Sequence, residues 1–372
     1  MTPNPVLGVF FHWLGGLASA SFYVPYRGVK RWAWETYWLV GGFFSWIISP
    51  WFLAYFLTRD LPAVLSETPA HTLLWAVFFG LLWGVGGLTF GLTMRYLGLS
   101  LGMAVALGLC AAFGTLVPPI FGGVFLTQVL GTLSGRFILG GVFVCLLGIA
   151  AAGIAGIYKE RALPLDQKLA AIKEFNLRKG VAVAVLSGVM SSCFAYGLAA
   201  GGPIKALTLK HGTPALWQGL PVLIVVLIGG FTTNFLWCLA LNFKNRTGFQ
   251  YFSASEEKYR QIRTNPNLEA DMTKSQPVPM TANYLFCALA GTTWYFQFFF
   301  YTMGETQMGK YGFSSWTLHM ASIIIFSSLW GIGLKEWKGA GAPALRLLTL
   351  ALFLLVGSTM IVGYGNYLGL AH

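Results

Sequence analysis

The sequence predicts an all-α integral membrane protein, with ten transmembrane helices arranged as two inverted five-helix repeats. Three observations predict this fold class: the composition, the number of long apolar stretches and a partial repeat of the first stretch halfway along the chain. Of the 372 residues, 56% are hydrophobic and 10% are charged, whereas soluble domains carry about 25% charged residues. The 46 glycines fit helices that approach one another closely in lipid.

Ten apolar stretches reach the roughly 20 residues that a helix needs to cross the hydrocarbon core. The N-terminal residues lack the basic region of a cleaved signal peptide, so we expect the first stretch to remain as a transmembrane helix. The predicted spans are 6–25, 37–57, 72–94, 100–121, 137–157, 180–200, 216–241, 282–303, 313–334 and 344–366.

Two long polar segments interrupt these stretches. Residues 158–179 form a predicted cytoplasmic linker between a first repeat, 1–157, and a second repeat, 180–372. The segment 242–280 is predicted to be a cytoplasmic surface loop or a short amphipathic helix, and a solvated linker is favoured over a partner-binding segment. Its charged residues include Glu256, Glu257, Lys258, Arg260 and Arg263.

The basic residues predict the orientation of the chain. The net charge is +12, but the Lys and Arg residues gather in short loops, as the positive-inside rule expects, so we expect no nucleic-acid partner. All but five of the 24 Lys and Arg residues follow odd-numbered spans, which places those loops in the cytoplasm and both termini in the periplasm. The five exceptions are Arg59, Arg136, Lys205, Lys210 and Lys310.

The first predicted helix resembles the sixth. Residues 8–22 align without gaps to 180–194, with identities at Gly8, Val9, Leu14, Gly16, Ser19 and Phe22. Five helices in each half would give the halves opposite orientations, as in secondary transporters that bind substrate near the middle of the membrane. Chance similarity between two helices rich in small residues is the alternative.

A few polar side chains fall inside or beside the predicted spans, where they are costly and commonly functional. They are His12, Glu35, Asn234, Gln297 and His319. The spacing from the predicted helix ends puts His12, Gln297 and His319 at one depth, about 9 Å below the outer ends at 1.5 Å per residue. This common depth favours a binding site over polar groups that only satisfy one another.

Helical spacing joins these residues to aromatic side chains. The first helix carries the stripe His12, Gly16, Ser19, Tyr23 and Tyr26, the eighth carries Trp294, Gln297, Tyr301 and Gly304, and the ninth carries Trp316, His319 and Ile323. Aromatic faces beside amides and imidazoles suit a small neutral sugar, because the rings cover C–H surfaces while the polar groups bond hydroxyls.

Other notable residues are predicted to be structural. The tryptophans near span ends are expected to be interfacial anchors, namely Trp32, Trp34, Trp38, Trp51 and Trp337. Three glycine pairs are expected to be helix-packing faces, namely Gly80/Gly84, Gly87/Gly91 and Gly98/Gly102. The isolated cysteines have neither metal-ligand nor disulfide spacing, namely Cys110, Cys145, Cys193, Cys238 and Cys287.

Several function classes are excluded by missing motifs. The sequence contains no GxxxxGK[ST] loop, so it is not predicted to be a primary pump. It contains no HExxH, and no catalytic residue, enzyme activity, metal or cofactor is predicted.

Several stretches, in order along almost the whole chain, resemble the bacterial L-rhamnose–proton symporters of the drug/metabolite transporter superfamily. They are HWLGGLASASFYVPY at 12–26, KRWAWET at 30–36, WGVGGLTFGLTMRYLGLSLG at 83–102, EFNLRKG at 174–180, QFFFY at 297–301, SWTLHM at 315–320 and LKEW at 334–337. The resemblance implies ten helices in two inverted repeats in the bacterial inner membrane, which import a 6-deoxyhexose with a proton. Enteric members carry Asn where this chain has Gly87 and Thr89, and many ten-helix relatives keep their termini in the cytoplasm.

Together these patterns predict the substrate site and leave two other functions open. The predicted substrate-binding residues are His12, Ser19, Tyr23, Trp83, Trp294, Gln297, Tyr301, Trp316 and His319. One alternative is a superfamily transporter or exporter of another sugar or metabolite. The other is a membrane sensor that docks a partner through the loop 242–280. We expect the bilayer and a small neutral sugar to be the partners, with no obligate protein partner.

The proton-coupling residue is predicted from charge. Rhamnose is neutral, so the coupling charge must lie on the protein, and histidine titrates nearest to physiological pH. His12 and His319 are equal candidates, with Glu35 third. For Glu35 an ion pair with Lys30 or Arg31 is the alternative role.

Overall fold

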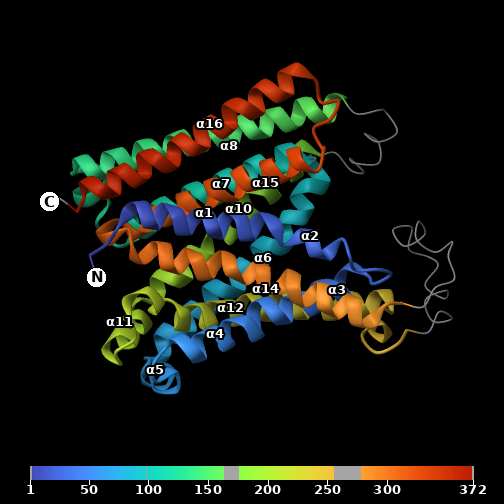
Figure 1. Cartoon of the computed structure of the whole chain (residues 1–372), viewed down its shortest axis with the longest axis horizontal. Coiled ribbons are helices and arrows are strands. Elements are labelled where there is room, and N and C mark those ends of the chain that lie inside the picture. Colours follow the sequence, from blue (N-terminus) through green and yellow to red (C-terminus); the bar gives the residue numbers. More distant parts are fainter. Residues whose placement is uncertain (1, 98, 163–175, 255–277, 371–372) are drawn as a thin grey trace.

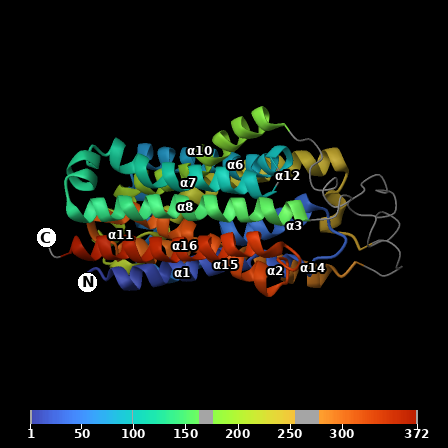
Figure 2. The same ribbon diagram turned by 90° about the horizontal axis from the view of Figure 1, so that it is seen from above.

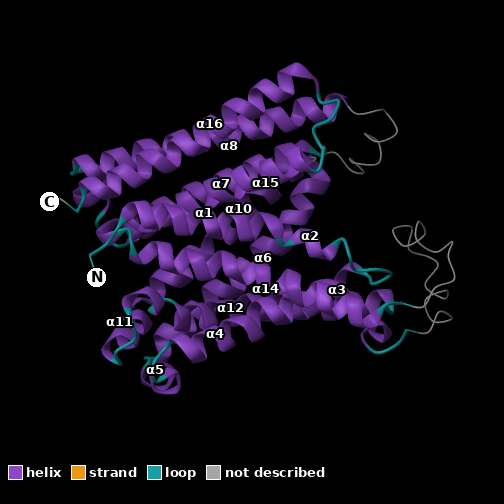
Figure 3. Ribbon diagram, in the orientation of Figure 1, coloured by secondary structure: helices purple, strands orange, loops and turns teal. Residues whose placement is uncertain are grey.

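The computed structural model describes residues 2–97, 99–162, 176–254 and 278–370. All the regular structure within these ranges is helical (Figure 3), so the predicted all-α fold class is confirmed. The charged residues predicted to make 242–280 a surface loop fall in 255–277, outside the described residues, as does most of the linker 158–179.

The long helices run side by side along one common direction (Figures 1 and 2). Both ends of the chain lie at one end of the bundle, and the connection between α2 and α3 lies at the other (Figure 1). The helices up to residue 162 are α1 Pro5–Ser21, α2 Tyr23–Tyr26, α3 Trp34–Phe43, the π-helix η1 Phe44–Ile48, α4 Ser49–Leu57, α5 Leu61–Glu67, α6 Ala70–Leu97, α7 Leu99–Phe121, the π-helix η2 Phe125–Leu130 and α8 Leu133–Ala162.

The second part of the chain continues the bundle. Its helices are α10 Leu177–Ala200, α11 Gly202–Lys210, the 3₁₀-helix η3 Ala215–Trp217, α12 Leu220–Asn245, the 3₁₀-helix η4 Gly248–Tyr251, α14 Met280–Thr306, the 3₁₀-helix η6 Gly309–Ser314, α15 Ser315–Gly333 and α16 Gly341–Leu368. Each predicted span falls on a helical segment. The short helices α5 and α11 were not predicted, because they are too short to stand out as apolar stretches.

Nine helical segments in the described part of the chain are long and apolar enough to cross a membrane. The long helix α14 is not one of the nine, since amide and hydroxyl side chains such as Asn283 and Gln297 lower its hydropathy. Many of its residues are nevertheless buried, and it packs against α1 and α3. The chain is therefore a multi-pass membrane protein with a comparatively polar helix in its interior.

Glycines allow α1 to lie directly against two neighbours. A Cβ added at Gly15 would lie 2.8 Å from the backbone oxygen of Gln297 in α14. A Cβ added at Gly16 would overlap Ser322 in α15. These contacts fix α1 between α14 and α15, as small residues do in membrane bundles.

The predicted glycine packing faces have mixed outcomes. Gly80 and Gly84 face α12, where an added Cβ at Gly84 would lie 2.7 Å from the Thr233 Cβ, so this packing face is confirmed. The interpretation of Gly87 and Gly91 as a packing face is wrong, because an added Cβ at either would meet nothing within 4 Å. Gly98 lies outside the described residues.

Candidate functional site

A cavity of about 610 Å³ lies in the half of the bundle that contains the α2–α3 connection. Among the described residues that line it, none has a charged side chain. They are Phe22, Tyr23, Trp34, Trp38, Trp46, Trp83, Gly84, Gly87, Leu88, Phe90, Gly91, Leu92, Leu107, Ser191, Asn234, Trp237 and Trp294. Gly87 and Gly91 therefore belong to the cavity wall, which explains why an added Cβ at either would meet no atom within 4 Å.

Stacked aromatic rings form one wall of the cavity. The Trp38 ring stacks on Trp34, with centroids 5.4 Å apart, and on Tyr23 at 6.5 Å. Trp294 lies 5.5 Å from Trp46 and 5.8 Å from Trp83. Such a wall offers apolar ring faces together with indole N–H donors, a combination that suits the alternating C–H and hydroxyl surfaces of a sugar.

The prediction that Trp38 is an interfacial anchor is wrong, whereas Trp34 is 39% exposed and also borders the cavity. Trp38 lies inside the bundle, edge-to-face with Trp46 and hydrogen-bonded to Asn234. The sequence held a signal for this, since Trp34 and Trp38 are four residues apart and therefore share a helix face. Trp32 is also buried, edge-to-face with Tyr284.

The two predicted anchors that remain lie on the surface. Trp51 is 40% exposed. The Lys159 ammonium nitrogen lies over the Trp337 ring, 4.8 Å from its centroid.

An amide in the cavity wall is held by two hydrogen bonds. The Trp38 indole Nε1 donates to Oδ1 of Asn234 over 3.1 Å. Asn234 Nδ2 donates to the Gly230 carbonyl over 2.9 Å. The sequence singled out Asn234 as an amide inside a span without giving it a role.

A second group of predicted residues forms a closed cluster in the other half of the bundle. The Tyr301 ring centroid lies 5.3 Å from that of His12 and 5.3 Å from that of His319. Both histidines are buried. Neither nitrogen of His12, nor Nδ1 of His319, has a hydrogen-bond partner among the described residues. The Ser322 hydroxyl lies between the two backbones, 2.9 Å from the His12 carbonyl oxygen and 2.8 Å from that of His319.

Trp316 borders this cluster, and Gln297 lies one helical turn before Tyr301 on α14. The Gln297 Nε2 is buried without a hydrogen-bond partner in the described part of the chain. The Trp316 indole N–H donates to the Cys110 carbonyl over 3.0 Å, so only its ring face is left for contacts. Unpaired buried polar atoms are rare in folded proteins, and several of those in the described residues are gathered here.

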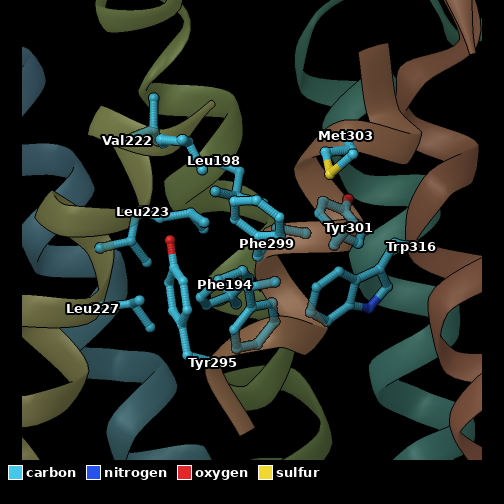
Figure 4. Packing of buried hydrophobic residues seen from close by; sticks show 14 of the residues in the cluster. Phe194, Leu198, Val222, Leu223, Leu227, Tyr295, Phe299, Tyr301, Met303 and Trp316 are labelled. Atoms are coloured by element: carbon cyan, nitrogen blue, oxygen red, sulfur yellow. The ribbon is translucent and has the colours of Figure 1, made fainter. Parts of the chain in front are cut away.

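An aromatic layer separates the cavity from the closed cluster. The rings of Phe194 and Phe298 are stacked, with centroids 3.8 Å apart. On the cavity side, Trp83 lies 5.0 Å from Phe194. On the cluster side, Trp316 lies 5.9 Å from Phe194 and His319 lies 5.7 Å from Phe298. Figure 4 shows Phe194, Tyr301 and Trp316 in this packed region. The predicted site residues are therefore divided between two compartments.

Two predicted residues belong to neither compartment. Ser19 is half-buried on α1 and is not part of the cavity lining. Glu35 is buried at the start of α3, where its Oε1 accepts hydrogen bonds from Asn245 Nδ2 at 2.9 Å and from the Thr247 hydroxyl at 2.8 Å. These bonds tie α3 to the end of α12.

An ion pair lies at the opposite end of the bundle from Glu35. Lys205 Nζ is 2.7 Å from Glu305 Oε2, and both side chains are largely buried. It joins α11 to the last turn of α14. Sequence reasoning missed it because the eighth predicted span stops at 303, before Glu305.

The helical membrane bundle with an uncharged cavity and a closed polar cluster defines the class of protein: a transporter. The family model described as "L-rhamnose-proton symport protein (RhaT)" matches residues 1–368. The chain belongs to this family, and the resemblance drawn from its motifs is confirmed.

Curated relatives give the same result. An "L-rhamnose-proton symporter" of Pectobacterium carotovorum subsp. carotovorum (strain PC1) is 36% identical over 364 residues, which cover 97% of this chain and 98% of the relative. A protein of the same name from Yersinia pestis (strain Pestoides F) is 36% identical over 363 residues, with the same coverage.

Proposed function

We propose that this protein imports L-rhamnose, or a closely related 6-deoxyhexose, together with a proton by alternating access across the bacterial inner membrane. The family and the names of the relatives support the substrate and the coupling ion. The observation that carries the proposal is the uncharged, tryptophan-rich lining of the cavity. A neutral sugar avoids the desolvation penalty that a charged metabolite would suffer there.

We also propose ten spans, with α14 as the tenth, in two inverted repeats of residues 1–157 and 180–372. In this arrangement α1, α6 and α7 of the first repeat are equivalent to α10, α14 and α15 of the second. The contact of α1 with α14 then corresponds to the contact of α10 with α6, and the contact of α1 with α15 corresponds to that of α10 with α7. The equivalent helices α8 and α16 pack on each other. Asn4 and Asn176, separated by the same 172 residues as the sequence repeat, each cap their helix by accepting backbone N–H groups. This pattern supports a pseudo-two-fold axis in the membrane plane.

The orientation follows from charge. Arg27, Lys159 and Lys244 lie at helix ends on the side of the α2–α3 connection, and we assign that side to the cytoplasm. The cavity then belongs to the cytoplasmic half of the protein and the closed cluster to the periplasmic half. The described conformation is accordingly the one that exchanges sugar with the cytoplasm.

In this scheme the sugar contacts two sets of residues in turn. Tyr23, Trp83 and Trp294 hold it in the cavity. Gln297, Tyr301 and Trp316, with the α1 stripe that includes Ser19, hold it when the opposite side is open. The Phe194–Phe298 layer must part between these two states.

His12 and His319 are the proposed proton carriers, with Glu35 third. Both ring nitrogens of His12 and Nδ1 of His319 are buried without a partner in the described residues, so a proton bound there would not have to break an existing hydrogen bond. The Glu35 carboxylate already accepts hydrogen bonds from Asn245 and Thr247, which supports a structural role.

Uptake into proteoliposomes tests the function. The full chain should accumulate labelled L-rhamnose when an inward acid gradient is imposed and should only equilibrate it without one. A facilitator would ignore the gradient, and a sensor would show no uptake. Either result would overturn the proposal.

A further inference from the structure

Resting on the proposed function, we propose that Asn234 is the amide that recognises two neighbouring hydroxyl groups of the sugar. It lies on α12, is 5% exposed and lines the cavity. Apart from Asn234, only Tyr23 and Ser191 contribute a side-chain hydroxyl or amide to the described lining. Asn234 is the member of this set that offers a donor and an acceptor in one rigid plane.

Half of the hydrogen-bonding capacity of this amide is left for a ligand. An asparagine side chain makes two donor and two acceptor bonds when it is fully satisfied. Among the described residues, Asn234 accepts one bond from Trp38 and donates one to the Gly230 carbonyl. One N–H and one lone pair therefore remain, which is the pair of partners that adjacent hydroxyls of a pyranose ring require.

The two existing bonds also fix which way the amide points. A carbonyl only accepts, so the Gly230 oxygen requires the amide nitrogen on its side. An indole N–H only donates, so Trp38 requires the amide oxygen on its side. A flipped amide would set donor against donor and acceptor against acceptor. The free donor and acceptor are thus oriented before the sugar arrives, which lowers the entropy cost of binding.

Trp38 couples this amide to the aromatic wall. Its indole donates to Asn234 and also stacks on Trp34. A sugar that lies against the aromatic wall brings its ring edge, with the hydroxyls, toward the amide. Its deoxy carbon then has apolar lining such as Leu88 and Leu107 to contact. The ligand class is a neutral pyranose with vicinal hydroxyls, and Trp38 is the positioning residue.

The test compares the native protein and its variants, each with L-rhamnose and with analogues that lack one hydroxyl, as in a double-mutant cycle. Binding of L-rhamnose and of its monodeoxy analogues is measured by calorimetry on the full chain in detergent. The native protein should bind the two analogues that lack either neighbouring hydroxyl roughly 10-fold more weakly than L-rhamnose. The variant Asn234→Leu, of similar size, should bind L-rhamnose more weakly but should lose this discrimination.

Two further variants separate recognition from folding. Thr232→Val removes a side-chain bond to a carbonyl four residues back on the same helix, outside the cavity lining, and should keep the native discrimination. Trp38→Phe keeps a ring but releases the Asn234 oxygen, and should reduce the discrimination even if Asn234→Leu does not fold. Equal discrimination in native protein and in whichever of the two cavity variants folds would overturn the proposal.

Failure of the proposed function is distinguishable. If the native protein binds no L-rhamnose, the function fails, and the same cycle is run with L-fucose, L-mannose and D-xylose and their deoxy analogues. Loss of discrimination in Asn234→Leu for any sugar that binds would support the role of Asn234. Binding of none of them would overturn both proposals.

Discussion

The unpartnered imidazole nitrogens of His12 and His319 are unusual at the scale of single residues, because buried polar atoms normally find a partner. If these groups carry the proton, His12→Gln and His319→Gln should retain sugar counterflow exchange but lose accumulation driven by an acid gradient. One proton at 100 mV supplies about 2.3 kcal/mol, which corresponds to roughly 50-fold accumulation. That accumulation should fall toward equilibration in the carrier variant.

The matched variant for this experiment is Glu35→Gln. It keeps an oxygen that accepts from Asn245 and Thr247, so we expect accumulation to persist. If all three variants accumulate sugar as the native protein does, the proton follows another route. If only Glu35→Gln fails, the third-ranked carboxylate is the carrier.

Gln297 is the second residue whose free donor predicts a ligand contact. Its Nε2 has no partner in the described part of the chain, and a hydrogen bond to a sugar hydroxyl contributes about 1–3 kcal/mol when its loss leaves a buried group unpaired. Gln297→Ala should therefore weaken L-rhamnose binding about 5-fold or more, and Trp316→Ala should weaken it through loss of the ring face. Equilibrium binding in detergent measures both effects.

Gln307, on the turn that follows α14, is the control for Gln297. Its amide is already used, because its oxygen accepts from the Asn4 backbone N–H and its nitrogen donates to the Thr306 hydroxyl. Gln307→Ala should lower thermal stability and leave sugar affinity unchanged. Native affinity in both Gln297→Ala and Trp316→Ala would contradict the placement of the sugar beyond the aromatic layer.

At the scale of helices, the close contact between α1 and α15 predicts a position where one added methyl group is not tolerated. A Cβ at Gly16 would overlap both the side chain and the backbone of Ser322. Gly16→Ala should therefore force α1 away from α15 and lower the melting temperature in detergent. Overpacking of this kind typically costs about 1–3 kcal/mol.

Gly140 provides the matched substitution. It lies inside α8 with nothing within 4 Å of an added Cβ. Gly140→Ala should be neutral or slightly stabilising, because alanine is the better helix former by about 1 kcal/mol. Equal melting temperatures for the two variants would show that the α1–α15 contact tolerates expansion.

Helices also set the limit of what the sequence predicts. Apolar runs of membrane length define helix existence because lipid requires every backbone group to bond within its own helix. The direction in which a helix face points depends on its neighbours, so Trp38 resembles an interfacial anchor until α3 is packed against α12. Gly87 and Gly91 resemble a packing face for the same reason.

The closed cluster could be foreseen in part. His12 and His319 share a predicted depth, and the structure brings both imidazoles against Tyr301. Their separation from Trp83 and Trp294 could not be foreseen, because it depends on the stacking of Phe194 on Phe298 from two helices distant in sequence. A pairwise ring contact of this kind leaves no periodic signal.

At the scale of the whole molecule, the charge distribution predicts the orientation of the protein in the membrane. The basic helix ends near the α2–α3 connection should face the cytoplasm, and both termini should face the periplasm. The side of the membrane to which the cavity belongs depends on this assignment. The native cysteines do not interfere with a labelling test, since all five are buried.

Single introduced cysteines therefore decide the orientation. Thr2→Cys and Leu370→Cys, close to the two termini, should react with a membrane-impermeant maleimide in intact cells whose outer membrane has been permeabilised. Lys338→Cys is the matched site at the basic end, where the side chain is exposed before α16 begins. It should react only after the inner membrane is broken, because it lies on the cytoplasmic side. The reverse labelling pattern would mean that the protein has the opposite orientation in the membrane. The described cavity would then receive sugar from the periplasm, and the closed cluster would lie toward the cytoplasm.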